Sequence, residues 1–188
     1  MIGDYKGFVK NRVVTALLQA YLDTLDYDGM KSILREAGLL ELKDQRDINP
    51  DHRIDFFSFK KIIAAQNCLL FESKDLLFEI GRKFSFYLFP FGKSFQESVE
   101  EITELIDTNW NVRIIEHSDT LFKIQIINCV FCSEIGIPCD LFKGFLVHTL
   151  EKTLTSGERV VYETPPENTQ NPNHNTFIIT LNIEKRIK

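Results

Sequence analysis

The sequence lacks long apolar runs, long basic runs and any apolar leader. No stretch approaches the ~20 apolar residues that a spanning helix needs, so no integral membrane segment is expected. The opening residues, MIGDYKGFVKNR, have no apolar stretch of signal-peptide character, and we therefore expect a cytoplasmic protein. Acidic and basic residues are interspersed, with a formal net charge of −5, which argues against nucleic acid as a partner.

Motifs for common enzyme chemistry are also missing. No Gly-x-Gly-x-x-Gly fingerprint of a nicotinamide or flavin site occurs, and the four histidines show no triad order. His148 follows Cys139 by nine positions, which is beyond hydrogen-bonding reach along a helix. His52 and His117 fall in expected loops or turns. We therefore expect a protein that is not an enzyme and that holds no NAD, FAD or haem.

The chain is long enough for one domain with a substantial core. Its 188 residues need no disulfide or metal staple to fold, and sixteen phenylalanines indicate a bulky apolar interior. We expect a single domain over 1–188, in which a helical hairpin over 1–48 is a candidate dimerisation element and 55–188 forms an α/β core. The polar segment 41–53 is the expected boundary between them.

The spacing of apolar residues predicts helices followed by strands. Gly81, inside one of these helices, is expected to let another element approach closely. Alternation predicts an antiparallel hairpin over 112–126 and two closing strands. The expected fold class is α+β, with helices packed on one face of a mainly antiparallel four-stranded sheet. The expected helices are 5–25, 28–38, 56–67, 73–90, 94–107 and 140–154, and the expected strands are 112–116, 121–126, 159–163 and 176–183.

Three cysteines before the helix over 140–154 are the strongest chemical signal. Cys129-x2-Cys132 is a spacing that lets two thiolates reach one zinc ion, and Cys139 supplies a third. His174 or Glu163 is the candidate fourth ligand. Two other interpretations stay open, namely that the thiols pack as small apolar groups, or that one of them is a nucleophile.

The order of features from Cys139 onward resembles the vinyl-4-reductase domain. In that domain, as here, a cysteine precedes a helix with a Gly-Phe step (Gly144-Phe145), a strand ends in glutamate (Glu163), and a metal-ligand-type residue (His174) precedes the last strand. The similarity covers about residues 68 to 184. Such domains occur in archaea and bacteria, alone or as sensor parts of regulators, and share their fold with the small subunits of the TRAPP vesicle-tethering complex.

The resemblance implies zinc held by Cys139 and Glu163. Pro166 stands where the next ligand is expected and His174 about where the last is, so Cys129 or Cys132 would have to complete the site. The resemblance also implies non-enzymatic sensing of a hydrophobic small molecule, of hydrocarbon or fatty-acyl type. The alternative is a scaffold subunit like those of TRAPP. A homodimer or a related subunit is the expected protein partner in either case.

The resemblances to the vinyl-4-reductase domain and to the TRAPP small subunits both imply an apolar cavity between helices and sheet. A filled core would use the same residues. In the TRAPP subunits, a cysteine placed like Cys68 carries a fatty acyl chain, whereas the other interpretation of Cys68 is a buried structural thiol. The expected lining residues are Phe84, Leu88, Ile124, Phe142, Phe145 and Leu146.

Overall fold

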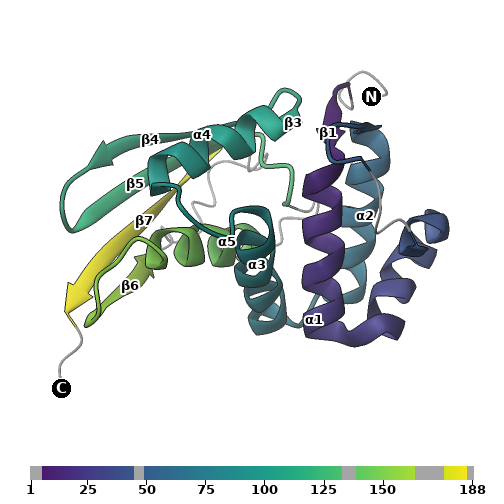
Figure 1. Ribbon diagram of the computed structural model, residues 1–188, viewed down its shortest axis with the longest axis horizontal. Helices are drawn as coiled ribbons and strands as arrows, with labels where there is room; N and C mark the ends of the chain where they lie inside the picture. Colours follow the sequence, from purple (N-terminus) through teal and green to yellow (C-terminus); the bar gives the residue numbers. More distant parts are fainter. Residues whose placement is uncertain (1–5, 45–48, 133–138, 164–175, 186–188) are drawn as a thin grey trace.

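The computed structural model combines a helical part with an antiparallel sheet (Figure 1). The description covers residues 6–44, 49–132, 139–163 and 176–185. The helices are α1 (Asn11–Glu36), the 3-10 helix η1 (Leu40–Asp44), α2 (Phe56–Leu69), α3 (Lys74–Leu88), α4 (Phe95–Leu105) and α5 (Asp140–Glu151). The strands are β1 (Phe8–Lys10), β2 (Arg53–Asp55), β3 (Ile106–Asp107), β4 (Asn111–His117), β5 (Leu121–Ile127), β6 (Glu158–Glu163) and β7 (Thr176–Lys185).

Helix α1 is broken at Asp26. This residue has φ of 65° and ψ of −175°, and its Oδ1 accepts hydrogen bonds from the N–H groups of Asp28 at 2.9 Å and Gly29 at 3.0 Å. A carboxylate in this position caps the helical segment that follows. The break expected between the helices 5–25 and 28–38 is therefore present, and the residue that caps the second segment is Asp26. The expected start of the first helix at Tyr5 is wrong, because β1 precedes α1.

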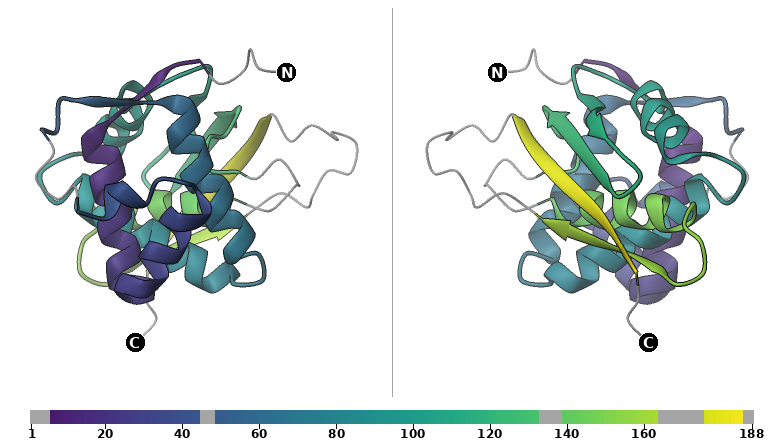
Figure 2. Two further views of the ribbon diagram at one scale, coloured as in Figure 1. Left: turned by 90° about the vertical axis from the view of Figure 1, so that its right-hand side faces the viewer. Right: turned by 90° about the vertical axis from the view of Figure 1, so that its left-hand side faces the viewer.

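The larger sheet has four strands in the order β4-β5-β7-β6, and all neighbouring strands are antiparallel. Ile124 of β5 pairs with Ile179 of β7, and both side chains are buried. Figure 2 shows this sheet on the opposite side of the molecule from α1 and α2. The expected α+β class is confirmed.

A second sheet joins the three short strands β2, β1 and β3. Each has only two or three residues, too few to show the period-two alternation by which strands are predicted. The sequence therefore gave no signal for it.

Helices α3 and α5 approach each other at two glycines. A Cβ on Gly81 would lie 1.8 Å from the carbonyl oxygen of Leu141, and a Cβ on Gly144 would lie 2.0 Å from that of Phe78. Both distances are far shorter than any allowed contact, so only glycine fits at either position. The close approach expected at Gly81 is confirmed, and the element that approaches is α5.

None of the helices in the described ranges is long and apolar enough to cross a membrane. The division of the chain at residues 48 and 55, and self-association through the N-terminal part, remain predictions.

Candidate functional site at three cysteines

Three free thiols gather where β5 leads into α5. Cys129 and Cys132 lie in the turn after β5, and Cys139 occupies the N-cap position of α5. Their Sγ atoms lie within 4.8 Å of one another, and those of Cys129 and Cys139 are 3.2 Å apart. Cys139 is buried, whereas the other two are half-buried. The structure thus brings together the three cysteines that the sequence singled out.

Two side chains of α2 hold this turn by hydrogen bonds to the backbone carbonyl groups of the turn. Lys60 donates hydrogen bonds from Nζ to the carbonyl oxygens of Val130 at 3.2 Å and Cys132 at 3.0 Å. Asn67 donates from Nδ2 to the carbonyl oxygen of Phe131 at 3.2 Å. Three consecutive carbonyl groups are therefore fixed by two side chains of one helix.

A buried chain of polar groups continues from Asn67 to α1. Gln66 donates from Nε2 to Oδ1 of Asn67 at 2.9 Å, and the hydroxyl of Tyr21 donates to Oε1 of Gln66 at 2.8 Å. All three side chains are at least 95% buried. Because buried polar groups are costly unless they are paired, this network fixes the orientation of the Asn67 amide.

The three thiols have different acidities. Burial alone would raise the pKa of Cys129, but hydrogen bonds from the thiols of Cys132 and Cys139 and from the N–H groups of Phe131 and Cys132 hold it well below its usual value. The pKa of Cys132 is raised, first by its hydrogen bond to Cys129. The pKa of Cys139 is raised by burial and then by its bonds to the other two sulfurs. The cluster therefore favours one thiolate, at Cys129, supported by two thiols.

The other predicted ligands do not join the cluster. Glu163 is an exposed residue at the end of β6, and His174 lies outside the described residues. Within the described ranges, the three cysteines form the one group of candidate ligand atoms close enough to share an ion.

The residues predicted to line a cavity are buried and in contact with one another. Phe84 lies 5.2 Å from Phe145 between ring centroids, and Phe142 lies 5.5 Å from Phe145. Phe131 adds a ring 5.2 Å from Phe142. The remaining three predicted residues, Leu88, Ile124 and Leu146, also belong to the packed core.

The sequence pattern did not single out Lys60, Gln66 and Asn67. One signal was available, because Gln66 follows Ile62 by four positions and therefore falls on the apolar face of α2. A polar residue on such a face needs a buried partner, but the identity of that partner depends on segments distant in sequence.

Cys68 stands apart from the cluster. It is exposed near the C-terminal end of α2, so the expectation of a buried structural thiol is wrong. Its acylation remains a prediction, although the resemblance from which it was inferred is corrected below.

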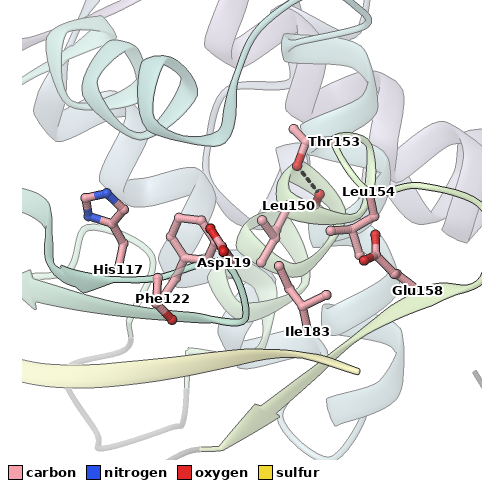
Figure 3. A pocket seen from close by; sticks show the side chains of 9 residues that line it. His117, Asp119, Phe122, Leu150, Thr153, Leu154, Glu158 and Ile183 are labelled. Carbon is pink, nitrogen blue, oxygen red and sulfur yellow. Dashed lines mark hydrogen bonds between the residues drawn. The ribbon is translucent and has the colours of Figure 1, made fainter. Parts of the chain in front are cut away.

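A surface cavity of about 580 Å³ lies at the turn between β4 and β5 (Figure 3). Its floor includes Phe122, Leu150 and Ile183, and its rim includes Asp119 and Glu158. The carboxylate of Glu158 already accepts hydrogen bonds from the backbone N–H and the hydroxyl of Thr155. The lining of this cavity therefore combines apolar and charged side chains, and its described residues form no cluster of reactive groups.

No protein-family model matches the sequence, and no curated protein matches it. Solved structures do match. An oxygen-binding H-NOX domain related to soluble guanylate cyclases is 14% identical, with a TM-score of 0.60 over 96% of this chain and 97% of that one. An unliganded Fe(II) H-NOX protein from K. algicida is 13% identical, with a TM-score of 0.54 over 96% and 99%. A third structure, described in terms of heme redox potential and porphyrin distortion, is 14% identical, with a TM-score of 0.59 over 94% and 99%. The chain has the H-NOX fold over nearly its whole length.

These matches correct the resemblance inferred from the sequence. The similar structures are H-NOX domains, not vinyl-4-reductase domains or TRAPP small subunits. The hydrocarbon or fatty-acyl binder and the vesicle-tethering scaffold are therefore wrong. The physical reason is that a cysteine, a glycine-containing helix and a strand ending in glutamate describe local order, which many α+β topologies share.

The expected cofactors are corrected as well. Zinc was expected and haem was not, whereas the similar structures are described as heme or iron proteins. One of these structures is described as an oxygen-binding domain, in agreement with the non-enzymatic role expected from the sequence.

Proposed function

We propose that this chain is a non-enzymatic sensor domain of the H-NOX fold that responds to oxidants through the thiols of Cys129 and Cys139. The observation that carries the proposal is the 3.2 Å contact between their sulfur atoms. In this proposal, helices cover one face of the four-stranded sheet and hold the thiols where β5 meets α5. A cytoplasmic location suits such a switch, because reducing conditions there return a disulfide to thiols.

The porphyrin of the similar structures does not fit the interior described for this chain. Five aromatic side chains fill the space beside α3 and α5, with neighbouring ring centroids 5.2 to 5.8 Å apart. A flat group of porphyrin size would have to displace several of these rings. The side chains are Phe84, Trp110, Phe131, Phe142 and Phe145.

Among the described residues, neither a histidine nor the hydroxyl of Tyr21 offers an axial ligand for haem iron beside these rings. Haem iron in proteins is held by histidine, cysteine, methionine or tyrosine. Of the described histidines, His52 and His117 are exposed, and His148 is half-buried beside Phe86, with both ring nitrogens buried and its Nδ1 3.9 Å from Glu151. The hydroxyl of Tyr21 is already bonded to Gln66. The donor groups of the described residues therefore favour sulfur chemistry at the cysteines.

The thiol reaction balances with a hydroperoxide as oxidant. The thiolate of Cys129 attacks one peroxide oxygen, the O–O bond breaks, and the distal oxygen leaves as hydroxide or alkoxide and takes up a proton. The Cys129 sulfenic acid then reacts with the thiol of Cys139, which forms the S–S bond and releases water. Two electrons pass from the two thiols to the peroxide. Thiolate character and accessibility govern the first step, and Cys129 is half-buried with its thiolate favoured.

The proposal is tested by oxidising the purified protein with hydrogen peroxide and mapping its disulfides by mass spectrometry. We expect a Cys129–Cys139 disulfide, reversible by dithiothreitol. In Cys139→Ser, the Cys129 sulfenic acid should persist and react with dimedone. Cys68→Ser is the matched control and should leave the disulfide unchanged, because Cys68 is exposed and outside the cluster.

Two outcomes would overturn the proposal. Oxidation confined to Cys68 would show that the cluster is unreactive. A Soret absorption band with about one haem per chain would show that the interior opens for porphyrin, and would replace the thiol proposal by haem-based sensing.

A further inference from the structure

We propose that the cavity between the β4–β5 turn and the end of α5 binds a small organic amine, with its apolar body on the floor and its ammonium group at the acidic rim. This proposal goes beyond the thiol sensor and uses none of its residues. The cavity and the thiol cluster lie at opposite ends of α5, because Cys139 occupies the N-cap position and Leu150 is in the last turn. The helix has 12 residues and is therefore about 18 Å long.

The cavity has the size of a small-molecule site. Its volume of about 580 Å³ lies within the range of roughly 300 to 1,000 Å³ that is typical of ligand pockets. Two turns form its walls, and backbone hydrogen bonds fix both of them. The N–H of Ser118 donates to the carbonyl oxygen of Leu121 at 2.8 Å, and the N–H of Glu158 donates to that of Thr155 at 3.2 Å. Because these walls are preformed, a ligand has little backbone to order on binding.

The floor of the cavity favours a flat apolar ligand body. The imidazole of His117 lies almost parallel to the ring of Phe122, with ring centroids 6.2 Å apart and an interplanar angle of 21°. Leu150 and Ile183 continue the apolar surface beyond these rings (Figure 3). An aromatic ring can bury its faces on such a surface without needing hydrogen-bond partners.

The rim of the cavity supplies hydrogen-bond acceptors. In the view of Figure 3, Asp119 and Glu158 lie on opposite sides of the apolar floor. The hydroxyl of Thr153 already donates to the carbonyl oxygen of Leu150 at 2.8 Å, so its own oxygen is left as an acceptor. An ammonium group has three N–H donors and no acceptor, and it therefore matches this rim.

The charge of the rim favours a cation over an anion. No lysine or arginine is among the described residues that line the cavity. Hydrogen bonds from the hydroxyl and the N–H of Thr155 hold the pKa of Glu158 below its usual value, so this carboxylate is charged at neutral pH. Lys185 lies opposite Glu158 in the pairing of β6 with β7, but it does not line the cavity. An anionic ligand would therefore meet two carboxylates and no lining lysine or arginine.

The experiment compares three ligands that share an indole ring and differ in charge. Tryptamine is cationic, tryptophol is neutral and indole-3-propionate is anionic. Binding to the full chain, with its thiols reduced, is followed at pH 7.5 by NMR of the methyl groups of Leu154 and Ile183, which line the cavity.

Two substitutions remove the charge of the rim with little change in shape, namely Asp119→Asn and Glu158→Gln. Glu163→Gln is the matched control, because Glu163 is an exposed carboxylate on the same strand as Glu158 and does not line the cavity.

We expect tryptamine to shift both methyl signals and to bind about three- to fivefold more tightly than tryptophol, as a partly exposed ion pair allows. Indole-3-propionate should bind more weakly than tryptophol. The double variant Asp119→Asn/Glu158→Gln should bind tryptamine and tryptophol equally, whereas Glu163→Gln should keep the parental preference.

Three results would overturn the proposal: methyl signals that tryptamine does not move, equal binding of the three ligands by the parent, or a parental preference in the double variant. Movement of the same signals by a lysine-rich peptide, but not by tryptamine, would also show that it is wrong, since the occupant would then be a segment of another protein. Cys129→Ser should bind tryptamine like the parent, so failure of the thiol sensor and failure of amine binding are separate results.

Discussion

Tyr21 is a residue of the helical part whose titration is coupled to folding. Its side chain is fully buried, burial raises its pKa well above the usual value, and its hydroxyl donates to Gln66. The protonated form is therefore required in the folded state, while the unfolded chain releases this proton near pH 10.

We predict that Tyr21→Phe lowers the free energy of unfolding at pH 7. We also predict that the free energy of unfolding of this variant falls less steeply than that of the parent as the pH rises above 10. At pH 7, the lost hydrogen bond leaves the Gln66 amide oxygen without its donor and costs about 1 to 2 kcal/mol. Above the unfolded pKa of tyrosine, the unfolded state binds fewer protons than the folded state. The free energy of unfolding of the parent therefore falls by up to about 1.4 kcal/mol per pH unit. Tyr21→Phe has no hydroxyl at this position, so its free energy of unfolding lacks this decrease.

Urea denaturation between pH 7 and 11 measures both effects. Tyr27→Phe is the control, because Tyr27 is 42% exposed. Parallel pH curves for Tyr21→Phe and the parent would contradict the assignment.

At the scale of elements, the α3–α5 contact connects the thiol cluster to the helical part. Helix α5 begins at Cys139 and reaches the backbone of α3 through Gly144. Arg82 of α3 adds an ion pair with Glu151 near the end of α5, at 2.6 Å. The helix that begins at Cys139 is therefore held near its middle and near its end.

We predict that Gly81→Ala and Gly144→Ala destabilise the protein by about 2 to 4 kcal/mol, as expected when a core is overpacked and helices must separate. In an ordinary exposed helix, glycine to alanine gains about 1 kcal/mol, so the sign itself is diagnostic. Chemical denaturation gives the free energies. Gly38→Ala is a useful comparison, since its added Cβ would meet nothing within 4 Å and only its φ of 68° opposes the change. A stabilising effect at Gly81 or Gly144 would refute the close contact.

The elements that the sequence predicted best are those with a strong period. The predicted strands 112–116, 121–126, 159–163 and 176–183 each fall inside one observed strand of the larger sheet. The predicted helix starts were less accurate than the predicted strands, because capping depends on local backbone geometry. Ser73 and Cys139 occupy N-cap positions without a side-chain cap, whereas Ser94 forms a full capping box.

At the scale of the whole molecule, the aromatic cluster decides which ligands the fold can accept. Phe131, from the same turn as the thiols, contacts Phe59 of α2, Phe84 of α3 and Phe142 of α5. One side chain from the turn after β5 thus packs against three helices.

We predict that Phe131→Ala destabilises the protein by about 3 to 5 kcal/mol, through lost burial and the cavity left behind. Phe91→Ala is the matched control, because Phe91 is 86% exposed, and it should change stability by less than about 0.5 kcal/mol. Thermal and urea denaturation measure both variants. Equal stability of the two would show that the interior already contains a space at Phe131, which would reopen the question of a bound planar group.

The sequence by itself determined the α+β class, the strands of the larger sheet, the close approach at Gly81 and the three cysteines worth attention. These follow from periodicity, glycine usage and spacing, which act over a few residues. The tertiary structure decided the H-NOX topology, the hydrogen bonds from Lys60 and Asn67 to the turn after β5, and the filled aromatic centre. Those hydrogen bonds join residues more than sixty positions apart in the chain, such as Lys60 and Val130, whose proximity is set by packing and not by local pattern.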